Sequence, residues 1–161
     1  MKLFTVSNKE EEKFLRKKPA DFDFSKYSKK EIKELVKTMR TIMKLSDGIG
    51  LSANQIGLNL NCFVAEADNK FYAIFNPQII KLSKERDDME EGCLSVPDSF
   101  GVVNRAERVW LEGFDSNGKK IKLKVWGFLA RIFQHEVDHL NGALFTDKCK
   151  DLREVKGNES R

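Results

Sequence analysis

The sequence predicts an α+β fold in which antiparallel strands wrap around one central helix, with a second helix on the N-terminal side. Three observations support this fold class. An apolar stripe with helical spacing follows a helix-capping pattern at residues 28–31. Strand-like segments joined by short polar turns occupy the middle of the chain, and a second helical pattern at residues 128–140 follows the last of them.

The length and composition indicate a single domain. The chain has 161 residues, of which 40% are hydrophobic and 34% charged, so it can bury a core of its own. We expect one domain over residues 1–161, ending in a short tail at about 146–161. The sequence contains no run of about 18 apolar residues, and its N-terminus lacks the apolar segment of a secretory signal. We therefore expect a cytoplasmic location and no contact with a membrane.

The charges and cysteines narrow the class of protein further. The net charge of +4 comes mostly from scattered lysines, which is typical of a solvated surface. Weak attraction to nucleic acid remains open as an alternative. The three cysteines, Cys62, Cys93 and Cys149, are an odd number, which argues against a disulfide framework in a reducing compartment. One or more of them is therefore a candidate metal ligand.

The N-terminal part of the chain contains one clear helix. Residues 1–27 are polar and irregular, and we expect an extended arm that places Phe22 and Phe24 against the body. Ser28 and Glu31 then form a capping box. The stripe that follows predicts a helix over residues 29–45, and its members are Ile32, Leu35, Val36, Met39, Ile42 and Met43.

The glycine-rich segment GIGLSANQIG, residues 48–57, follows this helix. It contains too many glycines and small residues for a plain strand. Glycine allows a backbone to approach a ligand closely, and Gln55 supplies a side-chain amide donor. An ordinary glycine-rich turn is the alternative interpretation.

The middle of the chain predicts two hairpins. Residues 62–67 and 71–76 read as strands around the turn residues 68–70, with Asn76-Pro77 ending the second strand and residues 78–82 as a third. A charged loop is expected over residues 83–88. Residues 107–115 and 119–126 then alternate in polarity around Ser116–Gly118, which predicts the second hairpin.

The last helical pattern carries the only two histidines of the chain. Phe128, Leu129, Ile132 and Leu140 lie on one face at helical spacing, and Asn141-Gly142 provides a stop. His135 and His139 are four residues apart, so their imidazoles lie one turn apart on that face and can reach one metal ion. Glu136 projects beside the open side of such an ion, as in the H-E-x-x-H signature of zinc hydrolases. The alternative is a pair of surface histidines on an amphipathic helix.

A hydrolytic metal site needs a third protein ligand. Downstream candidates lie in a polar tail and are Asp147, Cys149, Asp151 and Glu154. Cys93 lies upstream between Gly92 and Pro97, in a restricted loop that favours it as the ligand. Two other classes stay open at this point. A zinc metallopeptidase would use a carboxylate or histidine as third ligand, and a structural zinc domain would close the site with Cys149.

Three segments together resemble the signature motifs of the peptide deformylases. These are GIGLSANQ, EGCLSVP and QHEVDHLNG, in this order, and the resemblance extends from about Leu15 to Phe145. It implies a hydrolase that removes the formyl group from the initiator N-formylmethionine of nascent chains. It also implies one Fe²⁺ ion, replaceable by Zn²⁺, Ni²⁺ or Co²⁺, bound by Cys93, His135 and His139.

The resemblance assigns further roles by position. Glu136 would be the general acid and base, while the Gln55 side chain and the backbone amide of Leu94 would stabilise the oxyanion. Ile49 and Gly50 would line the substrate channel. The implied partners are N-formylmethionyl peptides, with transient association with the ribosome, and we expect a monomer.

The methionine pocket is expected on the helix face that carries the histidines. Phe128 and Ile132, about one turn apart, would form its apolar wall. Arg131 occupies a position that is often apolar in the family, and we expect its stem to line the mouth of the pocket with the guanidinium in water. Phe100 stands where many relatives have a basic residue.

Overall fold

The computed structural model describes residues 1–155 and confirms the α+β class. Its helices are α1 (Lys9–Leu15), α2 (Lys29–Leu45) and α3 (Gly127–His139), with single 3₁₀ turns at Phe24–Lys26, Ala53–Ile56 and Phe145–Asp147. Its strands are β1 (Gly50–Ser52), β2 (Cys62–Ala67), β3 (Lys70–Leu82), β4 (Arg86–Cys93), β5 (Val96–Ala106), β6 (Arg108–Phe114), β7 (Lys120–Trp126) and β8 (Cys149–Glu154). Among these residues no helix is both long and apolar enough to span a membrane.

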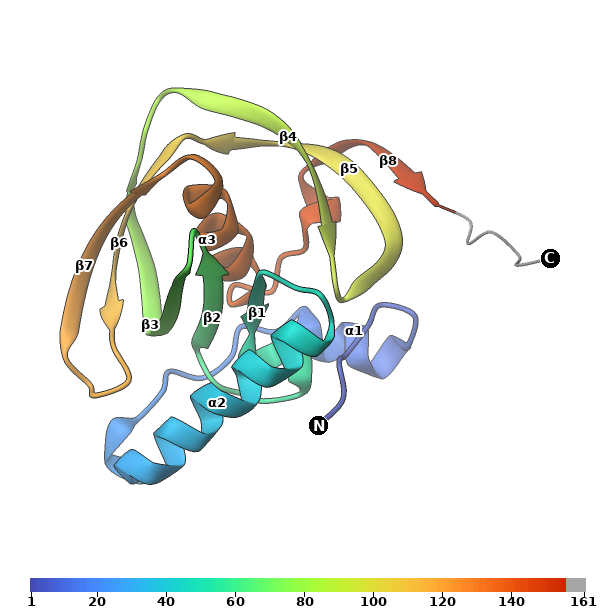
Figure 1. Ribbon diagram of the computed structural model, residues 1–161. Coiled ribbons are helices and arrows are strands. Elements are labelled where there is room, and N and C mark those ends of the chain that lie inside the picture. The colour runs from blue at the N-terminus through green and yellow to red at the C-terminus, as the bar shows by residue number, and fades with distance from the viewer. Residues whose placement is uncertain (156–161) are drawn as a thin grey trace.

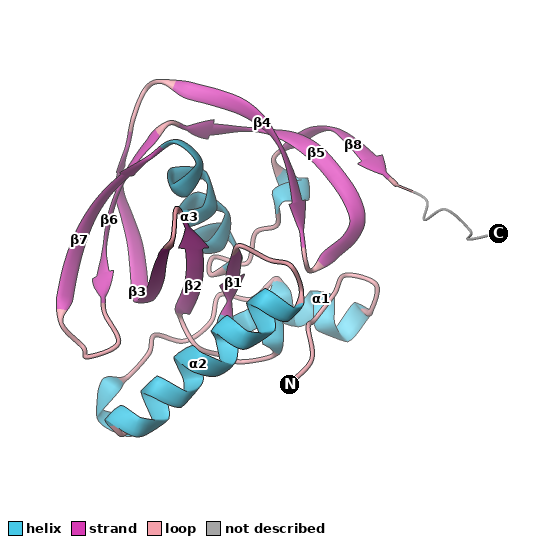
Figure 2. Cartoon of the chain, viewed as in Figure 1, coloured by secondary structure: helices cyan, strands magenta, loops and turns pink. Residues whose placement is uncertain are grey.

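The strands form two antiparallel sheets that enclose α3. The larger sheet has the order β1-β2-β3-β6-β7, and the smaller has the order β4-β5-β8. In Figure 1 the larger sheet curves along one side of α3, and β4 and β5 arch over its top. Figure 2 shows strands surrounding this helix while α1 and α2 stay at the periphery. The central helix of the predicted fold is therefore α3.

Two apolar clusters attach the helices to the larger sheet. One joins α3 to the inner face of the sheet, where Phe133 meets Phe63 and Tyr72 in edge-to-face contacts. The other joins α2 to the opposite face through Met39 and Met43. Because residues of a strand alternate between faces, one sheet can serve both helices.

The predicted helix over residues 29–45 is confirmed with the same bounds. The Ser28 hydroxyl accepts from the backbone amide of Glu31 at 3.2 Å, and the Glu31 carboxylate accepts from the backbone amide of Ser28 at 2.7 Å. The arm before it does place Phe22 in the core, beside Phe24 and Phe75. Residues 1–27 are not all irregular, however, since Asn8 caps α1 by accepting from two backbone amides.

Three other expectations about the strands were wrong. Asn76-Pro77 does not end a strand, because β3 runs through it with a bulge at which Asn76 has a φ of 47°. The segment expected as a charged loop contains the start of β4, which pairs with β5 in a long hairpin. The polar tail contributes β8, which pairs with β5. The glycine-rich segment, in contrast, is not a plain strand, as expected, because its three-residue strand β1 pairs with β2 and leads directly into a 3₁₀ turn.

Candidate active site

The three predicted metal ligands come together where α3 meets the end of β4. His135 Nε2 and His139 Nε2 are 3.3 Å apart, and Cys93 Sγ lies 3.2 Å from His139 Nε2. The three ligand atoms all lie within 4.8 Å of one another. Tetrahedral coordination with bond lengths of 2.0–2.3 Å requires ligand atoms about 3.4–3.6 Å apart. The donor set therefore fits a single metal ion of this size.

The alternative third ligands do not approach the histidines. No second cluster of histidine, cysteine, aspartate or glutamate ligand atoms occurs within residues 1–155. Asp147 instead accepts hydrogen bonds from Arg16 and from the backbone amide of Leu144. Cys149 donates to the carbonyl of Thr146 at 3.6 Å. This arrangement leaves Cys93, His135 and His139 as the candidate ligands, with a hollow on their open side.

The sulfur of Cys93 lies in an environment that favours the thiolate. Burial raises the pKa of Cys93, but the positive charge of His139 and hydrogen bonds from both imidazoles lower it well below the ordinary value. The backbone amide of Ser95 also points to the sulfur at 3.4 Å. Since the thiolate is the form of cysteine that binds metals, this environment suits Cys93 to a ligand role.

Glu136 lies beside the three ligands and is buried. Its Oε2 accepts a hydrogen bond of 2.7 Å from the hydroxyl of Ser52, a residue that the sequence did not single out for the site. Burial raises the pKa of Glu136, while the two histidines and Ser52 oppose this rise without cancelling it. A Cβ atom on Gly50 would overlap Glu136 Oε1, so β1 approaches this carboxylate as closely as a glycine allows.

Both amide atoms of the Gln55 side chain form hydrogen bonds that fix its orientation. Its Oε1 accepts from the backbone amide of Ser52 at 2.9 Å, and its Nε2 donates to Ser95 Oγ at 3.1 Å and lies 3.7 Å from Cys93 Sγ. The amide donor therefore points toward the ligand cluster. Leu94 directly follows Cys93 in the chain and lines the same hollow.

Sequence reasoning missed the carboxylate that supports His135. Glu91 Oε2 lies 2.9 Å from His135 Nδ1, on the ring atom opposite the one in the ligand cluster. Arg105 donates to both oxygens of Glu91, at 2.7 and 2.9 Å. Burial raises the pKa of Glu91, but Arg105 and His135 lower it far more, so the carboxylate stays ionised. Such a partner fixes the orientation of a metal-binding imidazole. The available signal was an acidic residue two positions before Cys93, on the same face of a strand.

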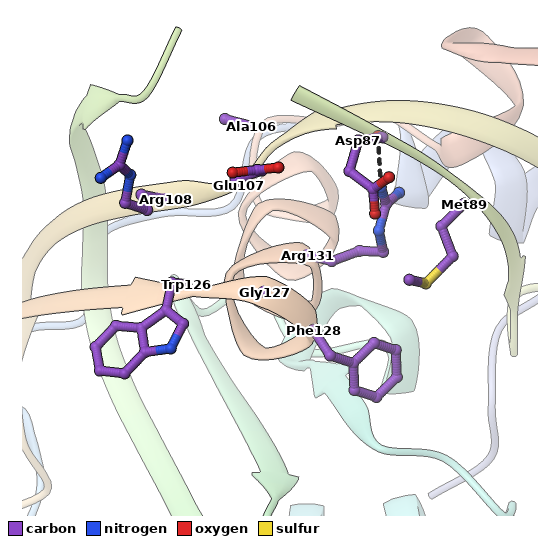
Figure 3. A pocket seen from close by; sticks show the side chains of 9 residues that line it. All are labelled: Asp87, Met89, Ala106, Glu107, Arg108, Trp126, Gly127, Phe128 and Arg131. Atoms are coloured by element: carbon purple, nitrogen blue, oxygen red, sulfur yellow. Dashed lines mark hydrogen bonds between the residues drawn. The ribbon is translucent and has the colours of Figure 1, made fainter. Parts of the chain in front are cut away.

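The expectation for Arg131 was wrong about its guanidinium, although the residue does line the hollow beside the candidate ligands. Its side chain is 6% exposed, and the guanidinium does not reach water at the mouth of the pocket. It donates to Glu91 Oε1 and to the carbonyls of Val103 and Asp87, each at 2.8 Å. Figure 3 shows this side chain running from α3 toward Asp87. The reason is that Glu91 offers a buried negative charge, which attracts a second arginine.

The ligands open onto a hollow of about 560 Å³ between α3, β4 and the loop before β1. The structure brings all the predicted pocket residues into its lining, namely Ile49, Gly50, Phe128 and Ile132. Ile132 is buried, whereas Phe128 is half exposed at the rim. Phe128 also borders a neighbouring hollow of about 470 Å³, where it lies with Met89 and Trp126 (Figure 3).

Comparisons with known proteins agree on one family. The model of the polypeptide deformylase family matches residues 4–155. A peptide deformylase of Halothermothrix orenii is 42% identical over 127 residues, which cover 78% of this chain and 82% of the relative. The crystal structure of peptide deformylase from Thermotoga maritima has a TM-score of 0.84 at 31% identity and covers 92% of this chain and 97% of that one. A probable peptide deformylase from Synechococcus phage S-SSM7 has a TM-score of 0.81 at 38% identity, with 92% and 99% covered.

Proposed function

The chain belongs to the polypeptide deformylase family, and we propose that Cys93, His135 and His139 bind the metal ion on which its activity depends. It is a metal-dependent hydrolase that removes the N-formyl group from nascent peptides. The observation that carries the residue assignment is the spacing of the three ligand atoms, with the Glu136 carboxylate beside them. The ion we propose is Fe²⁺, with Zn²⁺, Ni²⁺ or Co²⁺ as replacements, because imidazole and thiolate ligands accept all of these metals.

Glu136 is proposed to move the proton during hydrolysis. When bound, a divalent ion at this site supplies Lewis acidity toward water and toward the formyl oxygen. Glu136 takes a proton from the attacking water and later delivers it to the amine nitrogen as the carbon–nitrogen bond breaks and formate leaves. Burial raises the pKa of Glu136, which brings it closer to the pH at which it must both accept and release a proton.

The neighbouring groups are proposed to bind and orient the substrate. The Gln55 amide and the Leu94 backbone amide donate to the negative charge that develops on the formyl oxygen. Ile49 and Gly50 line the channel, and Phe128 and Ile132 receive the methionine side chain. Because the Arg131 guanidinium is held by hydrogen bonds to Glu91 and to two carbonyls, it is not free to turn toward the substrate, and the wall stays suited to an apolar side chain.

The cellular setting completes the proposal. We assign residues 1–161 to one catalytic domain that works as a cytoplasmic monomer and associates transiently with the ribosome. The family match over residues 4–155 supports the single domain. The nascent peptides on which the family acts support the association with the ribosome.

The test separates metal binding from proton transfer. Cys93→Ala, His135→Ala and His139→Ala should each lose most of the bound metal, whereas Cys62→Ala and Cys149→Ala should retain it. Glu136→Gln should keep metal and fold but lose about 10²–10⁴-fold in kcat. Metal content and formyl-peptide hydrolysis are measured on anaerobically purified, iron-loaded protein. Full metal occupancy in Cys93→Ala would contradict the ligand assignment.

A further inference from the structure

The β6–β7 hairpin presents an exposed basic face. Its inner residues, including Leu111, Leu123 and Val125, pack toward α3. Since alternate residues of a strand point to opposite sides, the intervening residues face outward. We call this outer surface, together with the adjoining residue of β3, the lysine face. It consists of Lys81, Trp110, Glu112, Lys120, Lys122 and Lys124, and the same outer side of the hairpin continues to Arg108 and the exposed Trp126.

Trp110 lies at the centre of the lysine face. It is the cross-strand neighbour of Lys81 on one side and of Lys124 on the other. The Lys81 ammonium is 4.8 Å from the centre of the indole ring, and the Lys124 ammonium is 5.2 Å from it. Within residues 1–155 neither ammonium forms a salt bridge. An aromatic ring attracts cations without neutralising them, so both lysines can bind an anion.

The rest of the face adds positive charge in a regular row. Lys120 and Lys122 share a single carboxylate, Glu112, at 3.5 and 3.0 Å. Four lysines and one glutamate leave an excess of positive charge. Along β7 the lysines recur at every second residue, about 6.8 Å apart, which is comparable to the separation of successive phosphates in a single nucleic-acid strand.

We propose that the lysine face binds single-stranded RNA through its phosphate groups. A row of cations beside an aromatic ring is the combination that such surfaces use. A lipid surface fits less well, because membrane-binding faces insert several large apolar side chains. Here Trp110 is only partly exposed between its lysines, and Trp126 is the one strongly exposed aromatic residue beside the row of lysines. This inference rests for its biological setting on the ribosome association proposed above, but RNA binding is measured separately from deformylation.

The test is a titration of a labelled uridine oligonucleotide with the metal-loaded protein, followed by fluorescence anisotropy. We expect about three phosphate contacts. The logarithm of the association constant should then fall with the logarithm of the salt concentration at a slope of about −2, since each contact on a single strand contributes about 0.7. The double variant Lys81→Gln/Lys124→Gln should bind at least about tenfold more weakly and reduce this slope by about 1.4. In Trp126→Phe, where Trp110 is the only tryptophan, RNA should quench the fluorescence.

The matched control is Lys33→Gln/Lys37→Gln, which removes the same charge from the exposed side of α2. It should leave RNA binding unchanged, and both double variants should hydrolyse a short formylated peptide at the wild-type rate. The proposal is wrong if the wild type shows no salt-dependent binding, if both double variants lose affinity equally, or if anionic vesicles bind in preference to RNA. Loss of hydrolysis in Lys81→Gln/Lys124→Gln would also overturn it, because the loss of RNA affinity would then result from a disturbed fold and not from the missing lysines.

Discussion

At the scale of single residues, Glu91 connects the buried charges to the ligand cluster. One carboxylate accepts from Arg105, Arg131 and His135. Arg105 continues the network to Asp138 at 2.7 Å, and Asp138 in turn accepts from Lys148. A buried ion group of this kind contributes little net stability as a whole, but removing one member leaves its partners uncompensated. The orientation of His135 therefore depends on a charge balance made by β4, β5 and α3 together.

We predict that Glu91→Gln destabilises the protein by about 3–5 kcal/mol, because two buried guanidinium groups lose their shared carboxylate. The same change should weaken metal binding by about 10–100-fold, since the imidazole of His135 loses its partner at Nδ1. Urea unfolding, with metal-loaded and metal-free protein, measures the first effect. Competition with a chelator measures the second.

Glu90→Gln is the control for this prediction. Glu90 is the next residue of the same strand and forms an exposed ion pair with Arg153. Its loss should cost no more than about 1 kcal/mol and leave metal binding unchanged. Equal effects of the two substitutions would show that Glu91 contributes only as a surface charge.

The sequence singled out the candidate ligands, which the structure brings together, but not the residues that support them. His135, His139 and Cys93 follow from residue types that are rare in this chain and from a spacing that matches metal geometry. Glu91 and Arg131 could not be found in this way, because single charged residues are usually exposed. Their burial follows only from the long-range pairing that brings β4, β5 and α3 together.

At the scale of elements, β1 brings the lining of the hollow close to the buried carboxylate of Glu136. It is only three residues long, and it is held by pairing with β2 on one side and by contact with α3 on the other. Gly50 allows this contact because a side chain there would enter the space of Glu136. The glycine at position 50 is therefore required for close packing against Glu136, which an ordinary glycine-rich turn would not need.

We predict that Gly50→Ala lowers kcat by at least about tenfold while the protein keeps its metal. The added methyl group must displace Glu136, and a misplaced acid–base group loses much of its contribution of about 10²–10⁴-fold. The comparison uses kcat for a formylated peptide and metal content of the same preparation. Wild-type kcat in Gly50→Ala would mean that Glu136 can move aside without loss of function.

The elements also differ in how clearly the sequence predicts them. The helix α2 has a capping box and a full apolar stripe, and β6 and β7 alternate cleanly, so local patterns were sufficient. The first five residues of β4 are all exposed and mostly charged, so this strand shows no alternation. It forms because β5 pairs with it along its length, up to the irregularity between Gly92 and Cys93. Such a strand is visible only once its partner is known.

At the scale of the whole molecule, the ligand cluster joins two separately hydrogen-bonded sheets. The histidines lie on α3, which packs against the larger sheet, whereas Cys93 ends a strand of the smaller sheet (Figure 1). Glu91 and Arg131 make a second connection between the same two parts. A metal ion bound here would therefore stabilise the position of the β4–β5 hairpin relative to α3 as well as take part in hydrolysis.

We predict that metal removal loosens the β4–β5 hairpin more than the larger sheet. A ligand present at about 1,000 times its Kd stabilises the folded state by about 4.1 kcal/mol, and here that energy links the end of β4 to α3. Backbone amides of β4 should then exchange with solvent at least about tenfold faster in the metal-free protein, whereas amides of β2 and β3 should change little. Hydrogen exchange read by mass spectrometry compares the two forms. Cys93→Ala should exchange like the metal-free wild type whether or not metal is added, because the connection to β4 is missing. A uniform change over both sheets would instead mean that the metal stabilises the domain as one cooperative unit.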